Sequence, residues 1–223
     1  MSDGPRVGGA GGASLASGGT ITVPGSGSIR IEPDVADLRL GVVSVRPTAA
    51  AARSAAAATM QAILDALLQA GIDRRDLRTT LVHLDALRDY TSGGTPSVTG
   101  YQLTNTVEAT IRVIETVGGA IDAALAAGAT SMDGLGFRLA DPAAALGEAR
   151  RRAVADARGR AQTLATEAGV TLGPVVEILE AGASVPGPPR PMVEMRMAGD
   201  LGTPIEAGTS ELTIDLTVTF AIA

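Results

Sequence analysis

The sequence contains no cysteine, no tryptophan, no lysine and a single histidine, His83. Without cysteine there is no disulfide, no thiolate nucleophile and no cysteine-bound zinc, and one histidine cannot form a two-histidine metal site. Schiff-base and P-loop chemistries both require a lysine. An enzyme would be left with carboxylates, hydroxyls and arginine. The composition therefore favours a binding, scaffold or assembly protein that is not an enzyme and has no cofactor and no metal.

Positive charge and aromatic rings are also scarce. The formal net charge is −6 and the chain has two Phe and two Tyr. Nucleic acids and anionic membranes bind basic faces, and single strands also need rings on which bases stack, so these partners are not expected. No apolar run reaches the roughly 18–20 residues of a transmembrane segment, and no secretory signal is recognisable. These absences predict a cytoplasmic location, with the periplasm or cell envelope as the alternative if a leader was removed.

The 223 residues are enough for one domain with a substantial core. The Gly-rich residues 1–19 are predicted to be a disordered tail, and residues 20–223 a single domain. Within that domain a loop rich in Pro and Met is expected at about residues 183–204.

Strands and helices alternate along this domain. Apolar residues repeat at every second position in predicted strands, and at steps of three and four in predicted helices. The strands are expected at residues 20–31, 35–45, 77–90, 98–113, 134–139, 175–179 and 212–222, and the helices at 48–70, 115–127 and 142–168. Each helix ends in Ala-Gly and precedes a strand. These repeated strand-helix-strand units predict an α+β fold, with three helices packed on a mixed, largely antiparallel sheet.

Two local features refine this prediction. The strands at 20–31 and 35–45 are expected to form a hairpin that turns at Pro33-Asp34. Gly25-Ser26-Gly27 suggests a bulge or bend near a sheet edge, because it lacks the lysine and the following helix of a phosphate-binding loop. Asp141 is the predicted N-cap of the third helix, and Pro142 its first residue.

The order and spacing of several short motifs resemble the SIMPL-domain family, which includes bacterial oxidative-stress defence proteins and a periplasmic immunogenic protein. The motifs lie at residues 25–36, 100–107, 137–170 and 204–208, so the resemblance covers nearly the whole of residues 20–223. The signature residues with an expected structural role are Gly27, Pro33, Asp34, Gly100, Tyr101, Asp141, Pro142 and Gly169. The resemblance implies an α+β fold without known catalytic residues, and in some members ring-like or channel-like homo-oligomers.

Polar clusters in the sequence have ordinary structural interpretations. His83 and Asp85 lie two apart in a strand and share a face, but no nucleophile motif accompanies them. Arginines lie at 150–152, 158 and 160. Glu148 with Arg152 and Asp156 with Arg160 are i,i+4 pairs, which favours a solvated, ion-paired face.

Three methionines follow the Pro-rich segment, namely Met192, Met195 and Met197. They are interpreted as part of a loop with no specific role, as residues that dock on a neighbouring subunit or partner, or as oxidisable sinks.

The leading hypothesis is a protein that self-assembles into a homo-oligomer, with a role in stress tolerance or envelope integrity. The alternative is a small-molecule or peptide-binding module with a groove near Tyr90 and Tyr101. A hydrolase is least favoured, because no carboxylate pair stands out at a suggestive spacing and residues 73–76 are expected to be a loop.

Overall fold

The computed structural model describes residues 18–89, 97–181 and 205–223. These residues form two antiparallel sheets with three α-helices, so the predicted α+β class is confirmed. The chain divides into two compact units, and each unit is built on one of the sheets.

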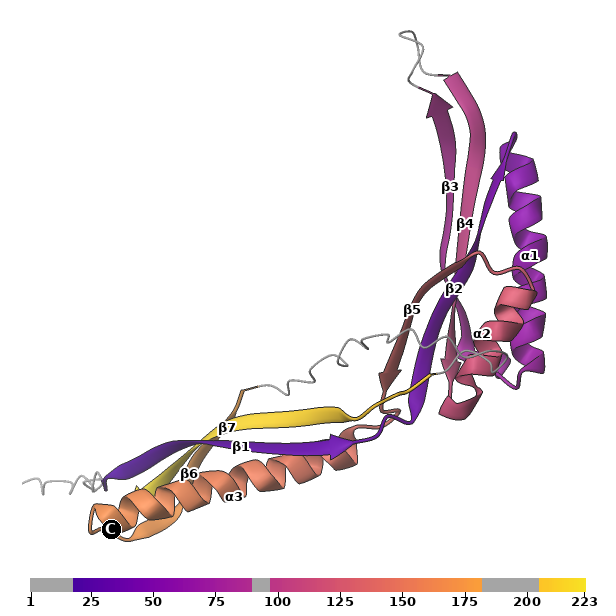
Figure 1. Cartoon of the computed structure of the whole chain (residues 1–223). Helices are drawn as coiled ribbons and strands as arrows, with labels where there is room; N and C mark the ends of the chain where they lie inside the picture. The colour runs from indigo at the N-terminus through magenta and orange to yellow at the C-terminus, as the bar shows by residue number, and fades with distance from the viewer. Residues whose placement is uncertain (1–17, 90–96, 182–204) are drawn as a thin grey trace, which may run out of the picture. The chain divides into compact units, whose positions relative to one another are not determined.

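The larger unit contains a four-stranded sheet in the order β3-β4-β2-β5. Its elements are β2 (Val35–Arg46), α1 (Ala49–Gln69), the 3₁₀ turn η1 (Arg74–Asp76), β3 (Leu77–Asp89), β4 (Ser97–Ile111), the 3₁₀ turn η2 (Ile114–Thr116), α2 (Val117–Ala126) and β5 (Ser131–Arg138). Helices α1 and α2 lie side by side on one face of this sheet (Figure 1). The core between the helices and the sheet includes Leu38, Leu40, Val42, Ala56, Ile63, Leu67, Val107, Ala109, Ile121 and Ala124.

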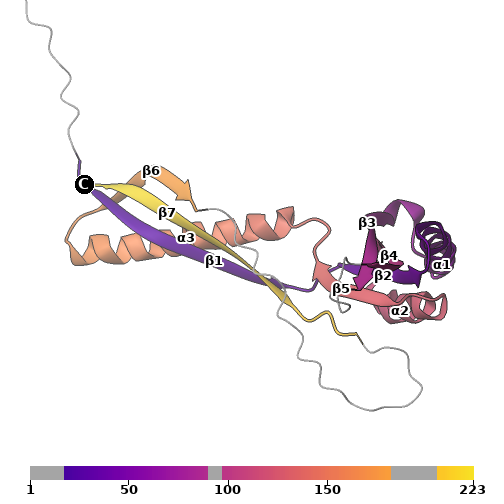
Figure 2. The same ribbon diagram turned by 90° about the horizontal axis from the view of Figure 1, so that it is seen from above.

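The smaller unit contains a three-stranded sheet in the order β1-β7-β6. Its elements are β1 (Thr20–Ile31), α3 (Ala143–Glu167), β6 (Leu172–Glu180) and β7 (Ser210–Ile222). Alternate residues of the central strand β7 are buried, as its pattern predicted: Leu212, Ile214, Leu216, Val218 and Phe220. Helix α3 runs along the sheet in both views (Figure 1, Figure 2).

The predicted hairpin between the first two strands is wrong, because β1 pairs in the sheet of β7 whereas β2 pairs with β4 and β5. The three residues between them do not close a turn. Pro33 is buried, and Asp34 bonds to the last residue of β5 and to a residue just after that strand. Its N–H donates to the carbonyl oxygen of Arg138 at 3.2 Å, and its carboxylate accepts from the N–H of Ala140 at 2.7 Å.

The glycines of β1 allow α3 to approach the strand closely. Gly25 and Gly27 are buried, and a Cβ atom on either would collide with a backbone carbonyl of α3, that of Ala153 or of Ala149 respectively. The helix presents a stripe of alanines in which every fourth residue is fully covered: Ala149, Ala153, Ala157, Ala161 and Ala165. Small residues on both elements therefore permit backbone-to-backbone packing.

All three helices end in the same capping motif. Gly71, Gly128 and Gly169 have φ values of +90°, +102° and +70°, a conformation that glycine adopts without strain. In α1 the N–H of Gly71 donates to Leu68 and that of Ile72 to Leu67, which is the pair of bonds of a Schellman motif. The same two bonds recur after α2 and α3. The predicted helix ends are thereby confirmed.

None of the helices in the described part of the chain has both the length and the apolar character needed to cross a membrane.

Candidate functional site

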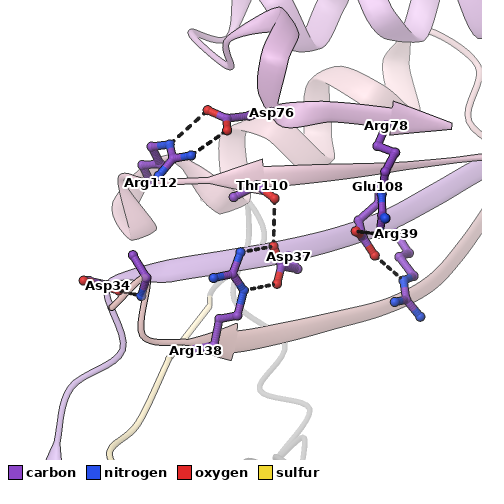
Figure 3. Close-up of polar contacts among 10 residues, drawn as sticks. Asp34, Asp37, Arg39, Asp76, Arg78, Glu108, Thr110, Arg112 and Arg138 are labelled. Atoms are coloured by element: carbon purple, nitrogen blue, oxygen red, sulfur yellow. Dashed lines mark hydrogen bonds and ion pairs between the residues drawn. The ribbon is translucent and has the colours of Figure 1, made fainter. Parts of the chain in front are cut away.

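Polar side chains from the four strands and from η1, all charged except that of Thr110, gather on the face of the four-stranded sheet opposite α1 and α2 (Figure 3). We call this group the charged ladder. It consists of Asp37, Arg39, Asp76, Arg78, Glu108, Thr110, Arg112 and Arg138. In the strands these residues alternate with the apolar residues of the core, so the two-residue period of a strand places them on the outer face.

Glu108 is the centre of one row of the ladder. The strand register sets Arg39 of β2 and Arg78 of β3 directly opposite Glu108 of β4. Nε of Arg39 donates to Oε2 of Glu108 at 2.7 Å, and Nη2 of Arg78 donates to Oε1 at 2.6 Å. One carboxylate thus joins three neighbouring strands.

Two further carboxylates each bind an arginine through two bonds. Arg138 of β5 donates from Nε and Nη2 to Asp37 of β2 at 2.6 and 3.3 Å, and the hydroxyl of Thr110 donates to the same carboxylate at 2.9 Å. Arg112, just after β4, donates from Nε and Nη2 to Asp76 at 3.0 and 2.7 Å. Paired bonds of this kind hold a guanidinium in a defined plane.

These bonds keep the carboxylates of the ladder ionised to a lower pH than free carboxyls. Hydrogen bonds from Arg39 and Arg78 lower the pKa of Glu108, and those from Arg112 lower the pKa of Asp76. Burial acts to raise the pKa of Asp37, but the bonds from Arg138 and Thr110 outweigh it, so this pKa is also lowered. A general acid or base needs a pKa near the working pH. The lowered pKa values move these three carboxyls away from that range.

The ladder surrounds a hollow of about 430 Å³. The arginines that line it are Arg75, Arg78, Arg112 and Arg138, and the acidic residues are Asp37, Asp76 and Glu108.

Several residues that the sequence analysis singled out lie outside the charged ladder, and their contacts are structural. Nε2 of His83 lies 2.9 Å from the carboxylate of Asp85, and both side chains are exposed on β3. The carboxylate of Asp141 accepts from the N–H of Ala143 at 2.8 Å, in agreement with its predicted capping role next to Pro142. Gly100 is buried, and a Cβ atom there would lie 3.2 Å from the carbonyl oxygen of Arg46.

The arginine-rich face of α3 is ion-paired, as predicted. Glu148 accepts from Arg151 and Arg152, and Asp156 accepts from Arg160. Arg150 reaches Glu180 of β6, a partner that the helix spacing alone does not reveal.

Of the remaining predicted site residues, the structure describes Tyr101 alone. Tyr101 is half-buried and packs against the core of the four-stranded unit. Tyr90 lies outside the described residues, and so do Met192, Met195 and Met197. Over residues 18–89, 97–181 and 205–223, no cluster of three or more His, Cys, Asp or Glu side chains has the arrangement to hold a metal ion.

The charged ladder was not predicted. Its strand residues do alternate outward in the sequence, with Asp37 and Arg39 in one strand and Glu108, Thr110 and Arg112 in another. That alternation indicates an outer face. Which charges pair, however, depends on which strands are neighbours. The predicted hairpin would have paired the second strand with the first, whereas Asp37 pairs with Arg138 of β5. The segment at 73–76 is a 3₁₀ turn rather than a loop without regular structure, and it positions Asp76.

Exposed apolar side chains form a second unusual feature, on β6 at one edge of the three-stranded sheet. Val176, Ile178 and Leu179 are each about half exposed or more, and Val175 is partly exposed. The edge strand β3 of the other sheet likewise exposes Leu81, Val82 and Leu84.

Comparisons with known proteins give consistent matches. The model of the SIMPL family, described as "Protein of unknown function (DUF541)", matches residues 21–220. The chain is 35% identical over 214 residues to the "26 kDa periplasmic immunogenic protein" of Brucella melitensis, a match covering 91% of this chain and 84% of that protein. It is 29% identical over 184 residues to "Uncharacterized protein YggE" of Escherichia coli K12, covering 82% of this chain and 74% of that protein.

The predicted cytoplasmic location is wrong, because the Brucella relatives that the chain matches over most of its length are named as periplasmic proteins. The prediction rested on the absence of an apolar leader among the first residues. Such an absence does not decide the compartment of a protein.

Proposed function

The chain belongs to the SIMPL family, as its motifs suggested, and we propose that it is a non-enzymatic periplasmic protein that works by self-association into a homo-oligomer. The exposed apolar edge strand β6 is the observation that supports this proposal. Val176 is 61% exposed and Leu179 is 58% exposed, on a strand that lies at the edge of the sheet formed by the described residues.

An open apolar edge is a liability in a protein that remains monomeric. Natural sheets protect such edges with charged residues, proline, bulges or a covering element, because an open edge pairs with other chains. β6 contains a proline, two glutamates and two shifts in its register with β7, yet it still exposes the apolar residues Val175, Val176, Ile178 and Leu179. A second copy of the chain that binds along this edge would cover them and complete the backbone hydrogen bonds.

The state of assembly tests the proposal. Light scattering on the purified chain at micromolar concentration should give a mass of more than one subunit. Replacing Val176 and Leu179 together by lysine should reduce that mass, because two charges on the edge oppose pairing. A strictly monomeric wild-type chain would contradict self-association.

The matched control is Leu125→Lys. Leu125 is 52% exposed, but it lies on α2 and not on a strand edge. This variant adds a charge to a similarly exposed leucine and should leave the mass of the assembly unchanged.

We further propose that the assembly contributes to stress tolerance or envelope integrity. A strain that lacks the gene should regain survival under peroxide or detergent when it is given the wild-type chain. It should not regain survival with the Val176→Lys, Leu179→Lys double variant. If the wild-type chain and the double variant restored survival equally, the cellular role would not depend on assembly.

A further inference from the structure

We propose that the charged ladder is a binding site for a small phosphate-bearing ligand. This inference is independent of self-association, because it depends on the outer face of the four-stranded sheet and not on the apolar edges. Three observations carry it: the difference in exposure between the acidic and basic groups, the N–H groups that remain for a ligand, and the hollow that the arginines line.

The carboxylates of the ladder are covered, whereas the guanidinium groups are exposed. The side chains of Asp76, Glu108 and Asp37 are 9%, 12% and 27% exposed. Those of the arginines that bind them range from 49% to 71% exposed. A ligand arriving from solvent therefore meets a layer of guanidinium groups with the carboxylates beneath it, although the chain as a whole is acidic.

The carboxylates fix the arginines in position without using all of their hydrogen-bond donors. A guanidinium has five N–H groups. Arg112 and Arg138 each use Nε and Nη2 for their aspartates, which leaves the other N–H groups to donate to a ligand. Because the side chains are already ordered, binding a ligand there costs less conformational entropy than binding to free surface arginines.

The geometry of the hollow favours phosphate over a single carboxylate. The hollow of about 430 Å³ is lined by Arg75, Arg78, Arg112 and Arg138, which come from η1, β3, the end of β4 and β5. β3 and β5 are the two edges of this sheet, about 14 Å apart at roughly 4.8 Å per strand, so Arg78 and Arg138 line the hollow from opposite sides. A phosphate group presents several oxygens to such donors and pairs with guanidinium through two parallel bonds.

Titration calorimetry with inorganic pyrophosphate at low ionic strength tests the site. We expect saturable binding with one site per chain, and affinity that falls as salt is added. Arg138→Gln should weaken binding by about tenfold, since it removes a charged donor. Because this variant also deprives Asp37 of its partner, Arg75→Gln is the second test. Arg75 is 76% exposed and its ion pair is with exposed Asp73, so the fold should tolerate its loss.

Arg160→Gln is the matched control. Arg160 is also an exposed, ion-paired arginine, but it lies on α3 outside the ladder, so this variant should bind pyrophosphate as the wild type does. Absence of saturable binding to the wild type would overturn the proposal, and so would an equal loss in Arg160→Gln.

Vesicles distinguish a soluble ligand from a lipid headgroup. Co-sedimentation with phosphatidylglycerol vesicles, but not with phosphatidylcholine vesicles, that is lost in Arg138→Gln would assign the phosphate to a lipid. Pyrophosphate binding without vesicle binding would assign it to a soluble ligand. If the chain binds neither pyrophosphate nor phosphatidylglycerol vesicles, the ladder serves only to join the strands.

Discussion

At the scale of single residues, the absence of a side chain at Gly25 and Gly27 determines how closely α3 packs on β1. Gly25 and Gly27 leave space that backbone atoms of α3 occupy, and the alanines of that helix complete the fit. The alanines of the helix recur at every fourth position in the sequence, a pattern that is compatible with close packing. The role of the glycines could not be predicted, because a Gly-Ser-Gly segment is equally typical of a bulge and of a site of close packing. Only the position of α3 against the strand distinguishes these two roles.

Gly27→Ala should destabilise the protein by about 2 to 3 kcal/mol, because the new methyl group collides with backbone atoms of α3 that cannot rotate away. Urea unfolding measures the change. Gly159→Ala is the matched control within α3, where a Cβ atom has nothing within 4 Å. It should stabilise the helix by about 0.5 to 1 kcal/mol. Equal effects of the two substitutions would contradict the close approach.

The ladder should make stability depend on acid pH. The folded pKa values of Glu108, Asp76 and Asp37 are lowered, so unfolded carboxyls bind protons first as pH falls. Their contribution to stability is complete above the unfolded values, about 4, and is lost as pH falls from there through the folded values. The free energy of unfolding, measured with urea between pH 7 and pH 3, should therefore fall at the acid end.

Glu108→Gln should reduce the steepness of that fall, because it removes one of the linked carboxyls. Glu167→Gln, at the end of α3 and outside the ladder, should keep the wild-type slope. If the free energies of unfolding of Glu108→Gln and the wild type changed in parallel down to pH 3, the ladder would not be the source of the acid sensitivity.

At the scale of elements, local chemistry defines where helices begin and end. The hydroxyl of Thr48 accepts from the N–H of Ala51 at the start of α1, and an Ala-Gly pair ends each helix. These features lie within a few residues of each other in the chain, which is why the helix ends were predicted closely from sequence. Strand pairing is different: β2 lies between β4 and β5, whose positions in the chain are distant, and no local residue specifies that choice.

Gly71→Ala should cost about 1 kcal/mol of stability, because its φ of +90° is strained for any residue with a Cβ atom. The cost is purely conformational, since nothing lies within 4 Å of the site of the new methyl group. Gly119→Ala in α2 also has open space around it and should be stabilising by about 0.5 kcal/mol. Thermal unfolding of both variants gives the comparison, and a neutral Gly71→Ala would show that the cap contributes little.

At the scale of the whole molecule, the two units differ in how the chain builds them. Most of the larger unit is one continuous stretch, residues 29–145, whereas the smaller unit combines three separate stretches that include the last strand of the chain. The earlier prediction of a single domain over residues 20–223 can be tested through this difference.

Deleting residues 213–223 removes most of β7, the central strand of the three-stranded sheet. We expect α3 to lose protection against hydrogen exchange, because the core residues from Ile214 to Phe220 are gone. Amides of α1 and β4 should remain protected, since their core lies in the other unit. Loss of protection in α1 as well would show that the two units fold as one.

The position of β7 also has a consequence for the timing of synthesis. Of the strands in the described part of the chain, β1 leaves the ribosome first, yet its neighbour β7 is the last of them to emerge. At about 5 to 20 residues per second, β1 waits on the order of ten seconds or more without that neighbour. A strand exposed for so long would aggregate if it were uniformly apolar. The Pro-Gly-Ser-Gly-Ser run of residues 24–28 gives β1 little tendency to pair wrongly while it waits, so the residues that fit the helix in the folded chain also protect the nascent one.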